Sequence, residues 1–266
     1  MKESEAGAVD FGDLDLSDNQ ALGKLDHLLD FLEKKWWRLV VMGLDRVPEQ
    51  GPCLLVGNQG SVLPWQALML SYSLRTRRVG ARKVYTLCDL ETHFEPDVAA
   101  ALRDYGFIEW SSANMKELLE KGEVVAIYPE GLAGLKKPFN RRYRLEEYDW
   151  TTLLPAVEVG KEARLEIYPV ASMGFDEINP MLGNVDLISK LLKLPYFPVT
   201  PFFPWLPAPL NLFHLPLDAS ISILKAATYG NPAGRDELEN ETKKLSLWLE
   251  GETQAELNRQ LRHRSL

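Results

Sequence analysis

The stretch that decides the fold is CLLVGNQGSVLPWQALML, residues 53–70. Its first five residues form an apolar run that ends in a Gly-Asn turn, and a Pro-Trp pair then opens an apolar segment with helical spacing. A buried strand followed by a turn and a helix is the repeating unit of α/β proteins. The turn of such a unit lies at the carboxyl end of the sheet, where these proteins bind ligands. At the positions where an enzyme would place a histidine and a carboxylate, this corner has Gln59 and Gln66.

The same alternation of strand and helix continues along the chain. Short apolar runs predict strands at 53–57, 83–89, 106–110, 123–129, 164–172 and 220–226. Helical patterns fall between and after them, over 64–76, 95–105, 112–121, 149–160, 184–193 and 233–248. This order predicts an α/β fold with a largely parallel mixed sheet flanked by helices. A chain of 266 residues with 45% hydrophobic content suits a single domain of this kind better than two small ones.

The two ends of the chain lie outside this alternation. Residues 1–18 are acidic and lack the continuous apolar core of a signal or transit peptide, so we expect them to be disordered. Residues 19–42 predict an N-terminal amphipathic helix, whose apolar positions are Leu22, Leu25, Leu28, Leu29, Leu32, Trp36, Leu39 and Val40. The expected organisation is a disordered segment over 1–18, the α/β domain over 19–232 and a C-terminal helical extension over 233–266.

The amino-acid composition limits which binding partners and which cellular compartment we expect. A formal net charge of −8 and a pI of about 5.2 argue against nucleic acid as a partner. Cys53 and Cys88 both fall inside predicted strands, so we expect buried thiols in a reducing cytoplasm, with neither a disulfide framework nor a metal site. No run of 18 residues is apolar and free of both charge and proline, so no conventional membrane-spanning helix is predicted.

One uncharged segment, residues 195–217, keeps a membrane surface among the candidate partners. Its repeated prolines forbid a continuous helix. The segment is either a meander buried against the core or an aromatic surface that dips into a bilayer interface. Lys34, Lys35 and Arg38 beside Trp36 also suit an interface. The expected location is cytoplasmic, with peripheral association at the inner face of a membrane left open.

A second loop follows the strand at 123–129 and concentrates positive charge. Pro129-Glu130-Gly131 opens this loop, and five cations follow Glu130 within 15 residues: Lys136, Lys137, Arg141, Arg142 and Arg144. Such a cluster is either a solvated face or a binding site for an anion. The planar fork of arginine and the point charge of lysine both suit phosphate, so a phosphate-bearing substrate is a candidate partner. Glu130 either caps a turn, orients a cation or hydrogen-bonds a substrate hydroxyl.

Four blocks of the sequence, in their order and spacing, resemble the glycerolipid acyltransferase family, which includes 1-acylglycerol-3-phosphate and lysophospholipid acyltransferases. The blocks are MGLDRVPEQGPCLLVGN, GFIEWSSANMKELLEKGEVVAIYPEG, GLKKPFNRRYRL and IYPVASMGFDEINPML, and the resemblance spans roughly residues 24–232. The family's Phe-Pro-Glu-Gly block has tyrosine in the first position here. The resemblance implies an acyltransferase-like fold and these substrate-binding residues: Asn58, Tyr128, Pro129, Glu130, Gly131, Lys136, Lys137, Arg141, Arg142 and Arg144.

The same resemblance implies acyl transfer from a thioester of coenzyme A or acyl carrier protein to a lysophospholipid or glycerol phosphate, without a bound cofactor. In the family, a histidine acts as general base on a glycerol hydroxyl and an aspartate orients the imidazole. The matching positions are Gln59 and Gln66, and the commoner family spacing would place the aspartate at Pro64. Because a glutamine amide does not take up a proton near neutral pH, Gln59 cannot be the base.

Three hypotheses follow from this replacement. The first is a catalytically impaired homologue, a pseudoenzyme of glycerolipid metabolism that still binds a lipid phosphate or an acyl thioester. The second is an active acyltransferase that uses a different base or the substrate phosphate. The third is a scaffold or interaction protein. Other groups weighed as a base or nucleophile are His93 with Asp97, His27, His214 and Ser61, and for each of them a structural role is the simpler interpretation.

Overall fold

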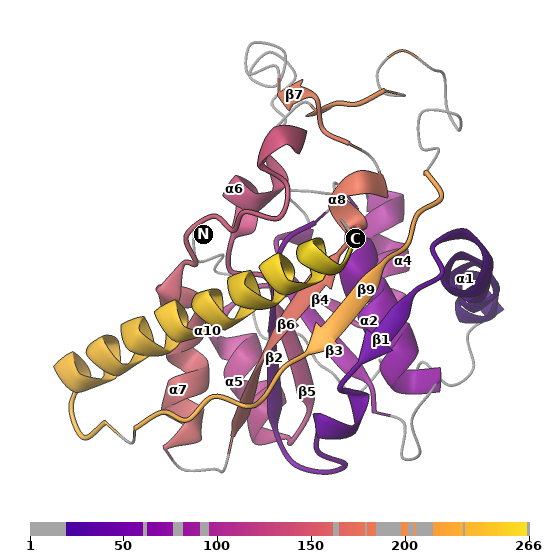
Figure 1. Cartoon of the computed structure of the whole chain (residues 1–266). Helices are drawn as coiled ribbons and strands as arrows, with labels where there is room; N and C mark the ends of the chain where they lie inside the picture. Colours follow the sequence, from indigo (N-terminus) through magenta and orange to yellow (C-terminus); the bar gives the residue numbers. More distant parts are fainter. Residues whose placement is uncertain are drawn as a thin grey trace.

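Seven strands form one sheet in the computed structural model of the chain (Figure 1). The structure describes residues 20–60, 63–76, 82–90, 96–161, 165–178, 180–184, 198–201, 205, 215–230 and 232–264. The order across the sheet is β1 (Val40–Met42), β9 (Ser220–Ile223), β6 (Glu166–Met173), β2 (Cys53–Gly57), β5 (Val124–Ile127), β3 (Val84–Cys88) and β4 (Phe107–Glu109). All neighbours pair in parallel except β6 and β9, which are antiparallel. The predicted fold class, a single α/β domain with a largely parallel mixed sheet, is confirmed.

Helices cover both faces of this sheet. One face carries α1 (Gln20–Phe31), α2 (Trp65–Thr76) and α4 (Pro96–Asp104), and the other carries α5 (Ser112–Glu120), α7 (Leu154–Gly160) and α10 (Arg235–Arg264). Short elements lie in the connections: η2 (Leu32–Trp36), η3 (Leu44–Arg46), α6 (Gly131–Leu135), η4 (Phe139–Arg141), η5 (Trp150–Leu153), α8 (Phe175–Ile178), and the antiparallel pair β7 (Gly183–Asn184) and β8 (Pro198–Val199). The order of strands and helices agrees with the alternation predicted from the sequence.

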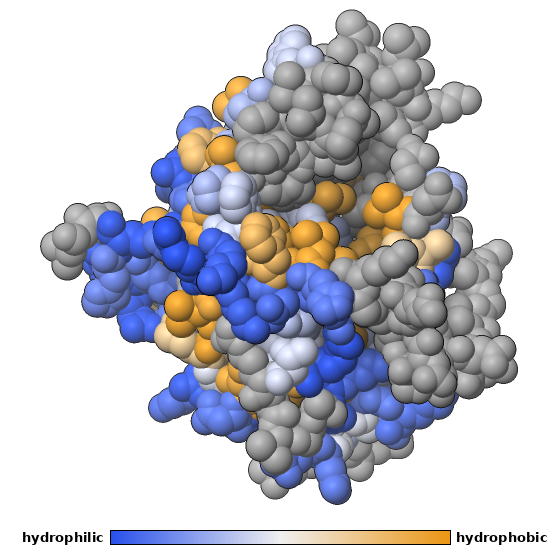
Figure 2. Space-filling model, turned by 90° about the vertical axis from the view of Figure 1, so that its right-hand side faces the viewer, coloured by the Kyte–Doolittle hydropathy of each residue, from blue (hydrophilic) through white to orange (hydrophobic). Residues whose placement is uncertain are grey.

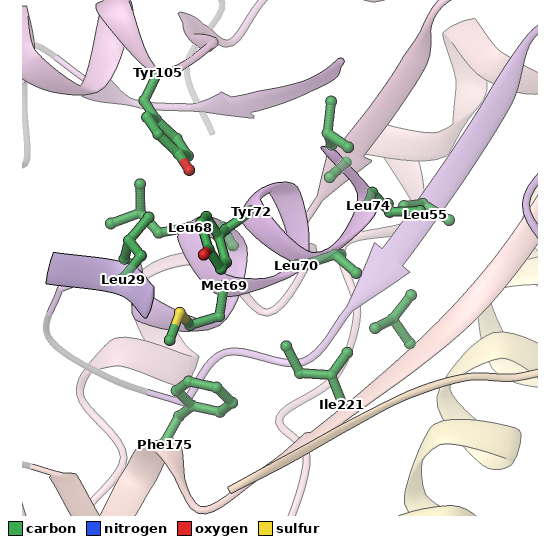
Figure 3. Close-up of a cluster of buried hydrophobic side chains, with 14 of the residues drawn as sticks. Leu29, Leu55, Leu68, Met69, Leu70, Tyr72, Leu74, Tyr105, Phe175 and Ile221 are labelled. Atoms are coloured by element: carbon green, nitrogen blue, oxygen red, sulfur yellow. The ribbon is translucent and has the colours of Figure 1, made fainter. Parts of the chain in front are cut away.

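Strand β2 is apolar throughout because it is buried on both of its faces. Successive side chains of a strand point to opposite sides, so Leu55 faces α2 while Leu54 and Val56 face α5 and α7. Figure 3 shows side chains of α2 filling the space between Leu55 and Ile221 of the sheet and Leu29 of α1. Full burial of each such side chain stabilises the fold by roughly 1.5–3 kcal/mol.

The helix predicted over 19–42 is too long, because residues 40–42 form the edge strand β1 instead. Helix α1 widens into the π turn η2, in which the Trp37 N–H donates to the Leu32 carbonyl oxygen at 2.7 Å. Arg38 then adopts a φ of 41°, which no helix tolerates, and the chain leaves as a strand. The Val40 N–H donates to the Ala219 carbonyl at 3.0 Å, so pairing with β9 outweighs the helical spacing of the apolar residues.

The C-terminal helix is longer than the predicted 233–248. Helix α10 continues to Arg264 because Leu249 and Leu257 stay buried along its length and Glu256 pairs with Arg259 at 2.6 Å. Residues 1–18, the predicted helix at 184–193 and most of 195–217 lie outside the described residues. Within the described part, no helix has the length and apolar character needed to cross a membrane.

Candidate functional site

A cavity of about 70 Å³ lies at the carboxyl ends of β3 and β5. Its walls come from both faces of the sheet, because residues such as Thr86 and Leu87 alternate along β3. This is the end of a parallel sheet where α/β proteins bind ligands. The lining residues are Gln59, Pro64, Gln66, Thr86, Leu87, Cys88, Asp89, Phe107, Trp110, Ile127, Tyr128, Pro129, Gly131, Leu135 and Thr152.

The two glutamines of the first loop both line this cavity. Gln66 lies in the first turn of α2 and is 1% exposed, yet neither its side-chain oxygen nor its side-chain nitrogen has a hydrogen-bond partner among the described residues. The same holds for the Thr86 hydroxyl and the Trp110 indole N–H, which also line the cavity. Buried polar groups are nearly always hydrogen-bonded, so these four atoms need a partner beyond the described residues.

Gln59 is held in place through its backbone. Its N–H donates to Oε1 of Glu130 at 2.7 Å, which ties the loop after β2 to the loop after β5. Gly134 of α6 makes this approach possible, since a Cβ there would lie 2.7 Å from the Gln59 Cβ and 2.8 Å from the Glu130 Cβ. The Gln59 side chain is thereby left at the cavity wall.

Glu130 is a structural clamp at this corner. Its side chain has no exposed surface, and Oε2 accepts from the Glu146 N–H at 2.8 Å and from Nζ of Lys137 at 3.3 Å. Burial raises the pKa of Glu130, while the Lys137 ammonium and the two backbone N–H donors act in the opposite direction. All of these partners are protein groups, and Glu130 is not among the lining residues of the cavity.

A third charged group, Asp176, lies next to this pair. It follows Phe175 at the start of α8, close to Gly60 of the first loop, and its Oδ2 is buried without a hydrogen-bond partner among the described residues. Burial raises the pKa of Asp176 to about 7; Lys137 opposes this shift and the Glu130 carboxylate adds to it. The buried Lys137 ammonium therefore stabilises two carboxylates, Glu130 after β5 and Asp176 after β6.

Asn58 and Tyr128 shape the corner without presenting charge. The Asn58 side chain donates to the Ser172 carbonyl at 3.0 Å and accepts from the Ser172 N–H at 2.7 Å, which joins the ends of β2 and β6. Tyr128 lines the cavity over Gly57, where a Cβ would lie 2.6 Å from its ring. Pro129 and Gly131 line the cavity as well, so the block at 128–131 contributes three lining residues and one clamp.

The cations of the second loop do not converge on the cavity. Lys137 is buried against Glu130, Arg141 pairs with Glu146 at 3.0 Å, and Arg142 lies 3.6 Å from Glu177 and over the Phe139 ring. Lys136 and Arg144 form no ion pair among the described residues; Arg144 is exposed and Lys136 half-buried. Three of the five cations therefore face carboxylates, Glu130 and Glu146 of the same loop and Glu177 of α8.

Sequence reasoning missed Asp89, Thr86 and Trp110 as lining residues. Asp89 and Trp110 directly follow β3 and β4 at the carboxyl edge, and that position was the signal available for them, whereas Thr86 lies in the middle of β3 and carried no such signal. Cys88 also lines the cavity, but burial raises the pKa of its thiol, which keeps it protonated and weakly nucleophilic.

The remaining candidates are absent from the described cavity. His27 is exposed on α1, and the described residues contain one further histidine, His263 near the end of α10. Ser61, His93, His214 and the side chain of Asp97 lie outside the described residues. No group of three potential metal ligands occurs in the part of the chain that the structure describes.

The fold has a counterpart among solved structures. The crystal structure of the 1-acyl-sn-glycerophosphate (LPA) acyltransferase from Thermotoga maritima superposes with a TM-score of 0.53 and 14% identity, over 88% of this chain and 80% of that one. The chain therefore has an acyltransferase fold. No family model matches the sequence.

Relatives by sequence are found in mycobacteria. Uncharacterized proteins of Mycobacterium tuberculosis and Mycobacterium bovis are 36% identical over 189 residues, which is 71% of this chain and 52% of each relative. An uncharacterized protein of Mycobacterium leprae is 36% identical over 188 residues, 71% of this chain and 50% of that one. The chain thus spans about half the length of the curated relatives it matches.

Proposed function

We propose that this protein is an acyltransferase-like component of glycerolipid metabolism that binds a lysophospholipid or an acyl thioester and is impaired in catalysis. The observation that carries this proposal is the placement of Gln59 and Gln66 on the wall of one cavity at the carboxyl edge of an acyltransferase fold. Neither amide acts as a proton acceptor near neutral pH. Loss of a base and its orienting acid removes a factor of roughly 10³ to 10⁶ in rate, while the binding surface stays in place.

Lys136 and Arg144 are the proposed contacts of the lipid phosphate. They remain without an ion pair among the described residues of the loop that borders the cavity, whereas Arg141 and Arg142 already face carboxylates. Phosphate binding by these two side chains is charge-assisted and therefore salt-sensitive. We expect Lys136→Ala with Arg144→Ala to weaken binding of lysophosphatidate more than Arg141→Ala with Arg142→Ala, in titrations at low and moderate salt. Equal effects of the two double variants would contradict this assignment.

The proposed membrane contact is the surface formed by α1 and β1. Leu28 and Phe31 are 44% and 49% exposed, Phe31 stacks on Trp36 at 6.1 Å, and Val40 and Met42 project from the edge strand. This side of the molecule faces the viewer in Figure 2, where hydrophobic residues gather across the middle between hydrophilic ones. Exposed Lys34, Lys35 and Arg38 lie in the same segment, where Lys34 pairs with Asp30 and Arg38 with Asp218 in solvent-exposed ion pairs. Apolar and aromatic groups beside cations fit the interface of an anionic bilayer.

The test of catalytic impairment is a gain of function. Wild type is assayed for acyl transfer from acyl-coenzyme A and from acyl carrier protein to glycerol 3-phosphate and to lysophosphatidate. We expect no transfer above background, and measurable transfer from Gln59→His with Gln66→Asp, because the pair restores an imidazole and its orienting carboxylate. Each single variant is the matched control and is expected to stay inactive. Robust turnover by the wild type with either acceptor would overturn the proposal.

The second candidate function is an active acyltransferase with a different base, and Asp89 favours it. Asp89 is the one carboxylate among the described lining residues of the cavity. If the wild type shows turnover, this candidate requires that Asp89→Asn abolish it while the overall fold, measured by circular dichroism, stays unchanged. Turnover that survives Asp89→Asn would exclude Asp89 as the base.

A further inference from the structure

The outer side of helix α10 faces solvent, and we propose that it binds a second copy of the chain as an antiparallel, two-fold symmetric helix pair. The helix lies across the front of the molecule in Figure 1. Its inner side packs on the domain through buried residues such as Leu245, Leu249 and Leu257. Its outer side exposes two large apolar side chains, Leu247 at 68% and Trp248 at 39%. The pairing does not depend on what the cavity binds.

The outer side carries a row of residues that we call the α10 seam. Its positions follow one another at alternating spacings of four and three residues, which keeps them on one side of a helix and is the pattern of paired helices. The seam consists of Glu237, Glu241, Lys244, Trp248, Gly251, Ala255, Asn258 and Arg262. All of these residues are exposed except Glu241, which is half-buried.

The seam is complementary to itself when two copies run in opposite directions. One register brings each large or acidic residue of the seam opposite a small residue, an amide or a cation. The facing pairs in this register are Trp248 with Gly251, Lys244 with Ala255, Glu241 with Asn258, and Glu237 with Arg262. Each pair occurs twice, because a two-fold interface uses the same patch on both subunits.

The centre of the seam offers an apolar anchor and a place for it. A Cβ added at Gly251 would meet no atom within 4 Å, so the indole ring of the partner's Trp248 can lie directly on the helix backbone there. Aromatic side chains that fill such a space dominate the energy of many interfaces. Exposed Leu247 borders the same layer, and the aliphatic stem of Lys244 covers the exposed Ala255.

The charges of α10 favour the antiparallel direction. Its first turn is acidic, with Asp236 and Glu237, and its last turn is basic, with Arg262, His263 and Arg264. Antiparallel pairing places the acidic start of one helix against the basic end of the other at both ends of the pair, whereas parallel pairing would bring like charges together. The helix dipoles also attract one another in this direction.

The same charges favour a second copy of the chain over a bilayer as the occupant. The outer side presents acidic residues at one end, which an anionic bilayer repels. Helices α10 and α1 pack on opposite faces of the sheet, so the pairing leaves the surface of α1 and β1 accessible.

Sedimentation equilibrium of the full chain tests the pairing. We expect the mass to rise with concentration from the 30.2 kDa of one chain toward twice that value. Gly251→Arg should weaken the dimer by roughly 30-fold or more, because it fills the central space in both copies. The monomer tolerates this change, since the position is open and arginine favours a helix. Ala101→Arg, on the exposed side of α4, is the matched control and is expected to dimerise like the wild type.

Charge reversal tests the ends of the seam. Glu237→Arg and Arg262→Glu should each weaken the dimer by roughly 10-fold, and the double variant should return to within about threefold of the wild type. Damage to α10 itself would not be repaired in the double variant. A wild type that stays monomeric up to about 200 µM would overturn the proposal, and so would a dimer that Gly251→Arg leaves unchanged, because its contact lies elsewhere.

Crosslinking tests the direction of the pair. In a mixture of the Lys244→Cys and Ala255→Cys chains, a short bismaleimide should join the two variants more efficiently than it joins either variant to itself. Identical positions in the antiparallel pair are eleven residues apart along the helix, about 16 Å. Wild type is the blank for Cys53 and Cys88. Preferential joining of identical variants would overturn the antiparallel arrangement.

Discussion

Lys137→Met tests the clamp that Glu130 forms at the carboxyl edge of the sheet. The substitution keeps the length of the side chain and removes the ammonium that lies 3.3 Å from Oε2 of Glu130, in a pair whose side chains are 1% and 0% exposed. Glu130 would then be a buried carboxylate with two backbone N–H donors and the neighbouring Asp176. Breaking a buried ion pair by removing one partner typically costs about 3–5 kcal/mol.

Protonation of Glu130 limits this loss. A carboxyl group with an ordinary pKa of 4.5 is protonated at pH 7 at a cost of about 3.4 kcal/mol, at about 1.4 kcal/mol per pH unit. The same step costs only about 0.7 kcal/mol at pH 5. In the folded variant, the pKa of Glu130 rises further. The variant therefore loses stability as the pH increases above the ordinary carboxyl pKa of 4.5. We therefore expect a loss of about 3 kcal/mol in the free energy of unfolding at pH 7 and about 1 kcal/mol at pH 5.

Urea unfolding of wild type and variant at pH 5, 6 and 7 measures this difference. Lys121→Met is the matched control, because Lys121 pairs with Glu117 at 2.7 Å but is 50% exposed, and exposed pairs contribute at most about 1 kcal/mol. Adding Glu130→Gln to Lys137→Met is expected to recover most of the loss, since no buried charge is left unpaired. A loss under about 1 kcal/mol at pH 7, or one that is the same at pH 5, would refute the clamp.

Three further variants test neighbouring features of the site. Gln66→Leu is expected to raise the free energy of unfolding by about 1–2 kcal/mol in urea titrations, since it removes two buried atoms that have no hydrogen-bond partner among the described residues. A clear loss would mean that the protein itself satisfies the amide. Gly134→Ala should destabilise the folded protein by about 1–3 kcal/mol, because the added Cβ would lie 2.7 Å from the Gln59 Cβ. The control Gly251→Ala on α10, where a Cβ meets open space, should stabilise the protein slightly. Asp176→Asn should have the same free energy of unfolding as the wild type near pH 4. Because the pKa of Asp176 is raised in the folded state, the wild type loses stability between about pH 4 and pH 7, so the variant should be more stable by on the order of 2–4 kcal/mol at pH 7. A difference that does not depend on pH would contradict this.

The fold was predictable because its signals are local. Strands β2, β3, β5 and β6 are largely apolar runs of four to eight residues, and helix α5 has its own cap, in which the Ser111 hydroxyl accepts from the Asn114 N–H at 3.0 Å. The secondary-structure prediction is wrong where pairing with a residue distant in sequence determines the local structure. Residues 40–42 have helical spacing, yet they pair with β9, which is 180 residues further along the chain. Such a pairing leaves no trace in the local pattern.

The site was predictable only in part. The sequence by itself determined that Gln59, Gln66 and the block 128–131 belong to loops at one edge of the sheet, because strand ends are visible in the apolar pattern. It also determined that positions 59 and 66 carry neutral amides, because an amide side chain is uncharged near neutral pH whatever its surroundings.

The tertiary structure alone decided how the charged and polar groups are used. Glu130 is seven residues from Lys137 in sequence, but the burial that makes this pair a structural clamp comes from loops far along the chain, including the one that holds Asp176. That polar atoms of Gln66, Thr86 and Trp110 have no hydrogen-bond partner among the described residues likewise depends on the three-dimensional arrangement of α2, β3 and β4. Residue type and order determine which polar and charged side chains are available. Because hydrogen bonding and desolvation act through space, packing determines which of these side chains still need a partner.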